Sequence, residues 1–211
     1  MRRIATLLCL LSALTVLSLG CAKPAPVRMT AQQYFDAGLK AYNQENFSQA
    51  AGQFEQASAA SPSLQEAFYY LGLSYWKLNM ADKAKAAFIN VLNLNPSHLY
   101  AHESLAMIFY REGNYPEAQR QLEAARGLNS INPEVFLALG NIYGKQSRCP
   151  EAQEAYQRGL AVDSANLALQ KALAEVKRNC GKPSPAPKGK AVRAKKSRVK
   201  VVTPAPQPSE F

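Results

Sequence analysis

The sequence has little of what catalytic sites are built from. Among its 211 residues there are only two histidines, His98 and His102, and there is no glycine-rich phosphate loop and no nucleophile-elbow motif. The histidines are four residues apart, but the glutamate of a zinc-protease helix is missing between them. Carboxylates gather only on predicted solvated helix faces. We therefore expect no enzyme activity, no metal site and no cofactor, with His98 at a helix start and His102 in a packing row.

A hydrophobic run long enough to span a membrane is also missing. The apolar run from Ile4 to Leu19 has sixteen residues. As a helix it would cover roughly 24 Å, against the ~30 Å of a bilayer core. It follows a basic start and ends in small residues, as secretory signals do. Residues 1–20 are therefore predicted to be a signal peptide, and a retained anchor is the alternative.

Charge is unevenly distributed along the chain. Between residues 30 and 180 there are 13 basic and 14 acidic residues, although the whole chain has a formal charge of +10. The stretch 181–211 holds eight basic residues, one acid and six prolines. Such a composition cannot form a core. We expect a neutral folded middle and a disordered, basic, proline-rich tail at 181–211.

A 34-residue period dominates the neutral middle. Small residues, alanines, and aromatic or leucine residues recur at this interval four times without insertion. A period of this length is typical of stacked helical hairpins, because one hairpin cannot bury its apolar face alone. The rows are Gly38, Gly72, Ala106 and Gly140; Ala50, Ala84, Ala118 and Ala152; Phe54, Phe88, Leu122 and Tyr156; and Tyr34, Phe68, His102 and Phe136.

These rows resemble the tetratricopeptide repeat (TPR) pattern. The resemblance implies an all-α fold, a TPR superhelix of four helix-turn-helix repeats plus a C-terminal capping helix. The repeats are expected at 31–64, 65–98, 99–132 and 133–166, with the capping helix at 167–180. First helices are expected near 31–44, 65–78, 99–112 and 133–146, and second helices near 47–60, 81–94, 115–128 and 150–163.

Local signals accompany these boundaries. Thr30 with Gln33, and Ser63 with Glu66, have capping-box spacing. Pro133 suits a first helical position.

Repeat three departs from the pattern. Ala106 replaces glycine, His102 stands in an aromatic row, and Ser130 stands where the first two repeats carry proline. These departures change no fold prediction.

The signal segment ends in the sequence LSLGC, which resembles the lipobox of bacterial lipoproteins. The resemblance implies acylation of Cys21 and a tether over residues 21–30. Ala22, in place of aspartate, favours the outer membrane by the same resemblance. We therefore expect a lipid-anchored protein of the bacterial outer membrane that faces the periplasm. An ordinary cleaved signal with an incidental cysteine is the alternative.

Two cysteines remain in the folded part, Cys149 and Cys180. In an oxidising envelope compartment such a pair is a disulfide candidate. Cys149 is predicted just past the end of the fourth first helix, and Cys180 ends the capping helix beside it. A Cys149–Cys180 disulfide is therefore expected, and two free thiols are the alternative.

In a TPR superhelix the first helices line the concave face, so the resemblance also implies a binding groove. Projecting the periodicity gives a groove rich in aromatic residues with a basic edge, a composition typical of protein interfaces. Its guest would be a polypeptide with apolar anchors and some acidity. Alternatively, the aromatic residues only pack between repeats and the basic ones only complement helix dipoles. The predicted groove residues are Phe35, Leu39, Tyr42, Tyr69, Leu73, Trp76, Lys77, Met107, Tyr110, Arg111, Asn141 and Lys145.

The tail carries seven basic residues from Lys188 to Lys200. In a secreted protein such a run is expected to attract anionic cell-wall polymers, lipid headgroups or acidic domains. A solubilising role without a partner is the alternative. Nucleic acid becomes the expected partner only if the signal interpretation is wrong, since backbone contacts need only dense lysine and arginine. No aromatic residues alternate with the basic ones for base stacking.

The predicted function is a protein–protein interaction scaffold or assembly factor of the bacterial cell envelope. Its plan is similar to that of the TPR lipoproteins that help assemble type IV pilus secretins. One alternative is a cell-wall-associated adaptor whose basic tail binds peptidoglycan or another anionic polymer. In a third interpretation the protein binds peptidoglycan or nucleic acid, the tail is the active part and the repeats only oligomerise. The partner is accordingly another envelope protein or peptide, or a cell-wall polymer.

Overall fold

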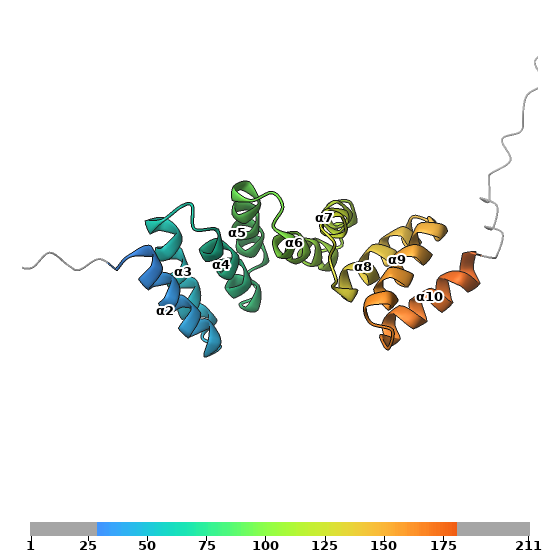
Figure 1. Cartoon of the computed structure of the whole chain (residues 1–211), viewed down its shortest axis with the longest axis horizontal. Coiled ribbons are helices and arrows are strands. Elements are labelled where there is room, and N and C mark those ends of the chain that lie inside the picture. Colours follow the sequence, from blue (N-terminus) through green and yellow to red (C-terminus); the bar gives the residue numbers. More distant parts are fainter. Residues whose placement is uncertain (1–28, 181–211) are drawn as a thin grey trace, which may run out of the picture.

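The computed structural model describes residues 29–180, and every regular element in that range is a helix. The helices follow one another as hairpins stacked along one axis, and the two ends of the described chain lie at opposite ends of the stack (Figure 1). The elements are α2 (Ala31–Asn43), α3 (Phe47–Ala60), α4 (Gln65–Lys77), α5 (Ala81–Leu94), α6 (Leu99–Arg111), α7 (Tyr115–Gly127), α8 (Pro133–Lys145), α9 (Cys149–Val162) and α10 (Leu167–Cys180).

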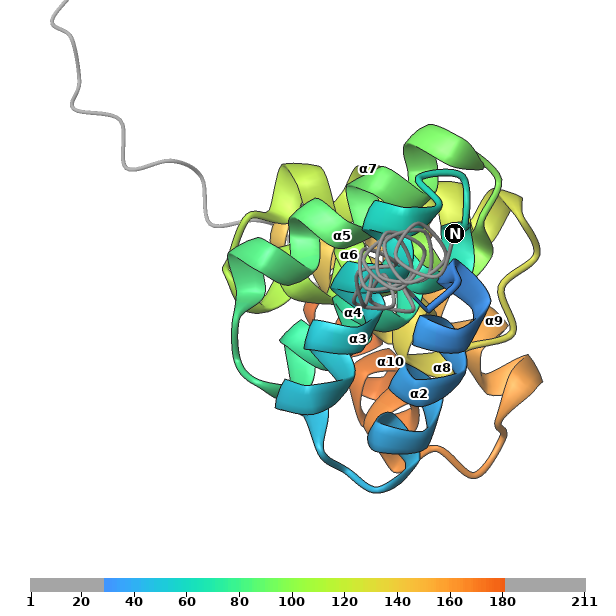
Figure 2. The same cartoon turned by 90° about the vertical axis from the view of Figure 1, so that its left-hand side faces the viewer.

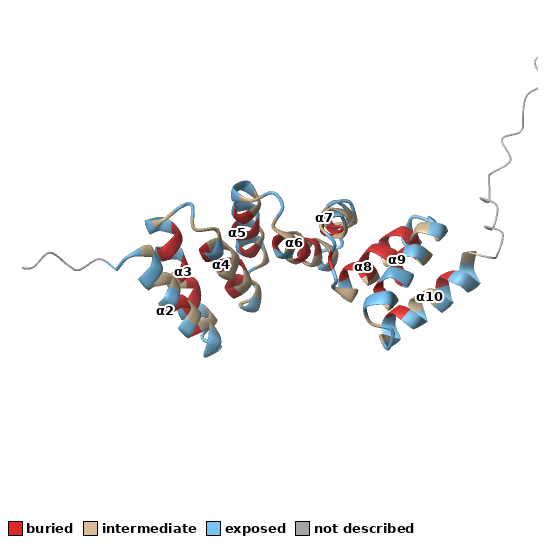
Figure 3. Ribbon diagram, viewed as in Figure 1, coloured by how far each residue is buried: buried red, intermediate tan, exposed pale blue. Residues whose placement is uncertain are grey.

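Successive helices pair into four hairpins, α2–α3, α4–α5, α6–α7 and α8–α9, and α10 packs on α9 and α8. Seen along the stack, the helices overlie one another (Figure 2). Buried residues run through its whole length (Figure 3). They form two clusters that meet at α6, where Phe109 packs against both. The predicted all-α superhelix of four hairpins with a capping helix is confirmed.

The row of small residues lets the two helices of a hairpin touch. A β-carbon added at Gly72 would lie 2.7 Å from the Phe88 ring, which is fully buried. Repeat three meets the same constraint with a different pair, since Ala106 and Leu122 are both fully buried at the equivalent positions. The extra methyl group of alanine is therefore accommodated where leucine replaces the aromatic ring.

The turn inside each hairpin requires a residue in the left-handed conformation. In all four turns this residue has φ between 58° and 75°. The residue after it donates its N–H to the carbonyl five positions earlier, at 2.9 Å, as in a Schellman motif. These turn residues are 34 apart but chemically unlike, so the sequence pattern did not reveal them. They are Glu45, Asn79, Gly113 and Ser147.

Replacing Glu45 with glycine is expected to raise the free energy of unfolding by about 0.5–1 kcal/mol, because glycine adopts the left-handed conformation without the steric cost that other L residues incur. Urea unfolding followed by circular dichroism measures the change. Glu45→Ala is the control and should bring no gain. A stability equal for the glycine and alanine variants would contradict this explanation.

One predicted helix cap is correct and one is wrong. The Thr30 hydroxyl accepts from the Gln33 N–H at 3.2 Å, and the Gln33 side chain accepts from the Thr30 N–H at 2.8 Å. Ser63 does not cap α4, whose N-cap is Leu64 without a side-chain hydrogen bond. The Ser63 hydroxyl lies 3.4 Å from that of Ser61 instead, because α4 begins one residue later than the capping box requires.

Three predictions fall outside the described residues. They concern the signal peptide at 1–20, acylation of Cys21 with most of the tether, and the basic tail at 181–211. Within residues 29–180, no helix combines the length and the apolar character needed to cross a membrane.

Candidate functional site

The predicted groove residues lie on the first helices of the four hairpins, α2, α4, α6 and α8. The aromatic, aliphatic and amide members are all half-buried, whereas the three basic members are exposed. Half-buried side chains pack against the core and still present part of their surface. We call this surface the groove face: Phe35, Leu39, Tyr42, Tyr69, Leu73, Trp76, Lys77, Met107, Tyr110, Arg111, Asn141 and Lys145.

An aromatic cluster joins the first two hairpins of the groove face. The Tyr70 ring on α4 meets Phe35 at 5.8 Å and Tyr42 at 5.7 Å, both edge to face and both from α2. Tyr69 meets the same ring at 5.6 Å. Such edge-to-face pairs stabilise beyond the area that they bury, so they help to hold the first two hairpins together.

Asn141 has a structural role within the groove face. Its Nδ2 donates to the Tyr110 hydroxyl at 3.0 Å, and its Oδ1 accepts from the Tyr156 hydroxyl at 2.8 Å. These bonds join α6, α8 and α9. Asn141 therefore fixes Tyr110, and its own amide is engaged within the protein.

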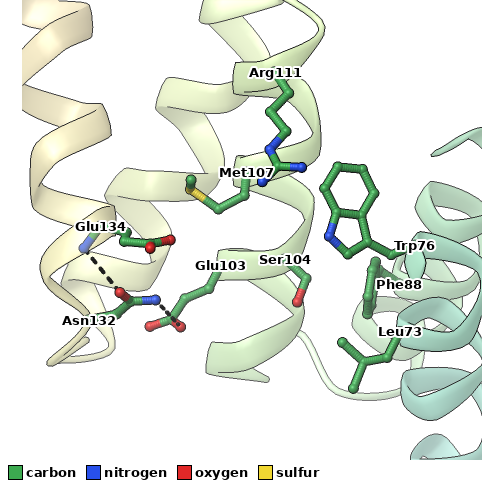
Figure 4. Close-up of a pocket in the computed structure, with 9 residues that line it drawn as sticks. All are labelled: Leu73, Trp76, Phe88, Glu103, Ser104, Met107, Arg111, Asn132 and Glu134. Atoms are coloured by element: carbon green, nitrogen blue, oxygen red, sulfur yellow. Dashed lines mark hydrogen bonds between the residues drawn. The ribbon is translucent and has the colours of Figure 1, made fainter. Parts of the chain in front are cut away.

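A pocket of about 220 Å³ opens between α4, α6 and the start of α8. Trp76 and Met107 line its apolar part, Arg111 lies at one edge, and Asn132 and Glu134 lie across from the Trp76 ring (Figure 4). Four lining residues belong to the predicted groove set: Leu73, Trp76, Met107 and Arg111. The other five were not in that set: Phe88, Glu103, Ser104, Asn132 and Glu134.

The polar end of the pocket is formed where repeat three departs from the pattern. The buried Glu103 carboxylate accepts from the Ser130 hydroxyl at 2.5 Å and from Asn132 Nδ2 at 3.2 Å. The α7–α8 linker turns through Asn129 at φ 60°, whereas the second helices of the other hairpins end in an extended residue. This turn carries Ser130 and Asn132 onto α6. Serine in place of proline at position 130 does not by itself predict this turn, because Ser164 holds the same place in repeat four and α9 ends in the extended residue Asp163.

Two exposed lysines of the groove face lie over aromatic rings. Lys77 Nζ is 5.9 Å from the centre of the Phe47 ring, and Lys145 Nζ is 5.1 Å from that of Tyr115. Phe47 and Tyr115 occupy the same repeat position, the first residue of a second helix. Each lysine at the end of a first helix thus reaches back over the preceding hairpin.

Arg111, equivalent to these lysines in repeat three, uses another ring. The position that holds Phe47 in repeat one holds Ala81 in repeat two, so no aromatic side chain is available there. The Arg111 guanidinium carbon instead lies 4.9 Å from the centre of the Trp76 ring, which places it at the pocket. We call Lys77, Arg111 and Lys145 the basic row.

Two tyrosines of the groove face, Tyr42 and Tyr69, and the neighbouring His98 carry no charge at neutral pH. Burial, followed by the nearby Tyr70 and other charges, raises the pKa of Tyr69 to about 12, and burial and Tyr70 also raise the pKa of Tyr42. Desolvation lowers the pKa of His98, whose ring lies 5.1 Å from that of Tyr69. At neutral pH the positive charge of the groove face therefore comes from the basic row.

Both histidines hold structural positions. His98 Nδ1 accepts from the Ala101 N–H at 3.1 Å at the start of α6. The ring nitrogens of His102 lie 2.7 Å from the side-chain oxygen of Gln121 and 2.9 Å from the carbonyl of Pro96. No group of three or more potential metal ligands occurs among residues 29–180.

The family model described as tetratricopeptide repeat matches residues 35–84 and 72–133. The chain carries tetratricopeptide repeats. The fourth hairpin and α10 continue the same TPR stack to residue 180.

Known proteins resemble the chain in sequence or in structure. The type IV pilus assembly protein PilF of Pseudomonas aeruginosa is 30% identical over 103 residues, which are 49% of this chain and 40% of PilF. The chain therefore spans less than half the length of this relative. MamA of Desulfovibrio magneticus RS-1 shares the fold with a TM-score of 0.65 at 18% identity, covering 71% of this chain and 86% of that one. YrrB, described as a TPR protein with an unusual peptide-binding site, has a TM-score of 0.59 at 23% identity, with coverages of 67% and 73%.

The TPR stack ends with the predicted cysteine pair. Cys149 begins α9 and Cys180 ends α10, and their Cα atoms are 5.9 Å apart with the sulfur atoms at bonding distance. Disulfides usually have Cα separations of roughly 4.4–6.8 Å. The structure brings the pair together, and the presence of the bond in the native protein stays a prediction.

Proposed function

We propose that the protein is an interaction scaffold or assembly factor of the bacterial cell envelope that binds a segment of a partner polypeptide on the groove face. The observation that carries the proposal is the pocket at which Trp76 and Met107 remain partly exposed. Tryptophan, methionine and arginine are enriched where proteins bind one another. Both side chains keep part of their surface open to the pocket, whereas Phe88, which also lines it, is fully buried.

The envelope part of the proposal depends on sequence likeness. The LSLGC sequence supports an acyl anchor at Cys21, with the TPR stack outside the cytoplasm and attached to the outer membrane. The 30% identity to PilF supports a role in type IV pilus or secretin assembly. In this proposal the protein binds and positions its partner and performs no catalysis.

Truncating Trp76 to alanine is expected to weaken partner binding about thirtyfold, the effect of removing an interface hot spot. A photoreactive residue at Tyr110 of the full-length protein would first capture the partner, and mass spectrometry would identify it. The dissociation constant would then be measured with purified components. Ile89→Ala is the control, because Ile89 is an exposed apolar residue on α5, outside the groove face. An unchanged dissociation constant for Trp76→Ala, with an intact helical spectrum, would refute the proposal.

The basic run from Lys188 to Lys200 favours a second candidate, a cell-wall-associated adaptor. Deleting Lys182–Phe211 separates the two candidates. If the groove face binds the partner, the dissociation constant of the truncated protein stays within about twofold of the native value. That is well below the tenfold change that a loss of 1.4 kcal/mol in binding free energy would cause. If the tail is the binding element, the truncation abolishes partner and peptidoglycan binding together, and Trp76→Ala changes neither.

A further inference from the structure

The cations of the basic row have no acidic partner within the described residues. Ion pairs in the range 29–180 use other cations, namely Lys85, Arg120, Arg148 and Arg158. Lys77, Arg111 and Lys145 contact aromatic rings instead. Their N–H groups therefore stay available to an anion, and the contacts with the rings fix the positions of the charges.

The aromatic rings restrict where these charges can be. A long side chain loses rotamer entropy when it binds a ligand, and a cation held against a ring has already lost part of it. The interaction with the ring is modest at exposed sites, so it positions the cation without competing strongly against a carboxylate. The basic row is in this sense pre-organised for anions.

The opposite side of the pocket is acidic. Glu134 is exposed on α8, across the pocket from Trp76 (Figure 4). The buried Glu103 beneath it is held by Ser130 and Asn132. A guest in the pocket therefore meets positive charge at Arg111 and negative charge across from it. This polarity would orient a guest whose charge lies on one side only.

We propose that the groove face recognises an acidic segment of its partner, in which a large apolar side chain enters the pocket beside Trp76 and neighbouring carboxylates contact the basic row. This inference rests on the proposed function and names the chemistry of the partner. The first helices α6 and α8, which carry Arg111 and Lys145, pack directly on one another, and packed helices are typically spaced by roughly 8–10 Å. An extended chain advances about 3.3 Å per residue, so acidic residues about three apart would meet successive cations.

A uniform polyanion fits this surface less well than such a peptide. It could pair with the basic row, but it would leave the apolar part of the pocket at Trp76 and Met107 unfilled. An acidic peptide with one apolar anchor fills that part as well.

Neutralising the basic row is expected to remove the preference for acidic peptides. The probe is a short fluorescein-labelled peptide with one phenylalanine and glutamates at every third position, compared with the same peptide carrying glutamine. The full-length protein is expected to bind the glutamate peptide about tenfold more tightly, the sum of a few screened ion pairs. The triple variant Lys77→Gln, Arg111→Gln and Lys145→Gln should bind both peptides equally. About 1 M salt, where charges are screened beyond roughly 3 Å, should have the same effect on the native protein.

The control removes the same charge elsewhere, through Lys83→Gln, Lys171→Gln and Lys177→Gln. Lys83 also lies over a ring, that of Tyr75 at 5.2 Å, but on α5. This control should keep the tenfold preference. Equal loss in both triple variants would overturn the proposal, because net charge alone would then be responsible.

Reversing the basic row to glutamate guards against a merely misfolded variant. That variant should prefer a lysine-substituted probe, a gain that structural damage cannot produce. Equal binding of the glutamate and glutamine probes by the native protein would overturn the inference, and so would polyphosphate binding that the Lys77→Gln, Arg111→Gln and Lys145→Gln variant weakens as much as it weakens binding of the glutamate probe. Neither result would contradict the proposed function. That function fails only if Trp76→Ala leaves partner affinity unchanged.

Discussion

Truncating Phe88 to alanine is expected to lower the free energy of unfolding by about 3–5 kcal/mol, the usual cost of deleting a buried aromatic ring. Phe88 is fully buried and packs against Gly72 across the second hairpin. The space cannot refill from that side, because glycine has no side chain to move into it. Urea unfolding measured by circular dichroism gives the change, and a loss below about 1.5 kcal/mol would contradict this packing.

The chain itself supplies the matched control for Phe88. Gly72→Ala alone should destabilise by about 1–3 kcal/mol, since overpacking forces the ring to shift. Gly72→Ala combined with Phe88→Leu reproduces the pair found at Ala106 and Leu122. Its cost should be clearly smaller than the sum of the single variants, because contacting residues are not additive. Strict additivity would show that the glycine and aromatic rows are not coupled.

The period of 34 residues made the fold predictable, because it fixes which residues lie between the two helices of a hairpin. Glycine opposite an aromatic ring has one explanation, a close helix approach. The turn residues escaped prediction for the opposite reason. Glu45 and Ser147 adopt the same left-handed conformation as Gly113, and their positions are imposed by the closing hydrogen bonds and not by their own preferences.

The sequence predicted which repeat positions contribute to the candidate site, but it did not predict all the residues and contacts that form the pocket. Leu73, Trp76, Met107 and Arg111 follow from the register of first helices, and the structure brings them to one pocket. Asn132 reaches that pocket only because the preceding linker turns at a single residue. Arg111 stacks on Trp76 because Ala81 offers no ring. The first contact depends on the backbone conformation of one linker residue and the second on a missing side chain, and a repeat pattern records neither.

Replacing Cys149 and Cys180 with serine is expected to lower the free energy of unfolding by about 3–4 kcal/mol. The estimate is the chain-entropy cost of opening a loop whose ends are 31 residues apart in sequence. Non-reduced peptide mapping of the mature protein should recover the two cysteines linked. Reduced native protein should then unfold at the same urea concentration as the double serine variant. Two alkylatable thiols without reductant, or stability unchanged by reductant, would contradict the prediction.

The loss should be concentrated in the last hairpin. Helix α10 buries only Leu169 and Val176, so little apolar contact holds it when the covalent link is absent. Leu169 is fully buried, and a β-carbon added at Gly159 would lie 2.7 Å from it. Its departure would expose the core of α8 and α9. Hydrogen exchange in the reduced protein should therefore rise in α8–α10 and stay unchanged in α2–α5, because stacked repeats contact only their neighbours. A uniform rise along the chain would mean that the TPR stack unfolds as one unit, with the cysteine pair supporting the pocket from a distance.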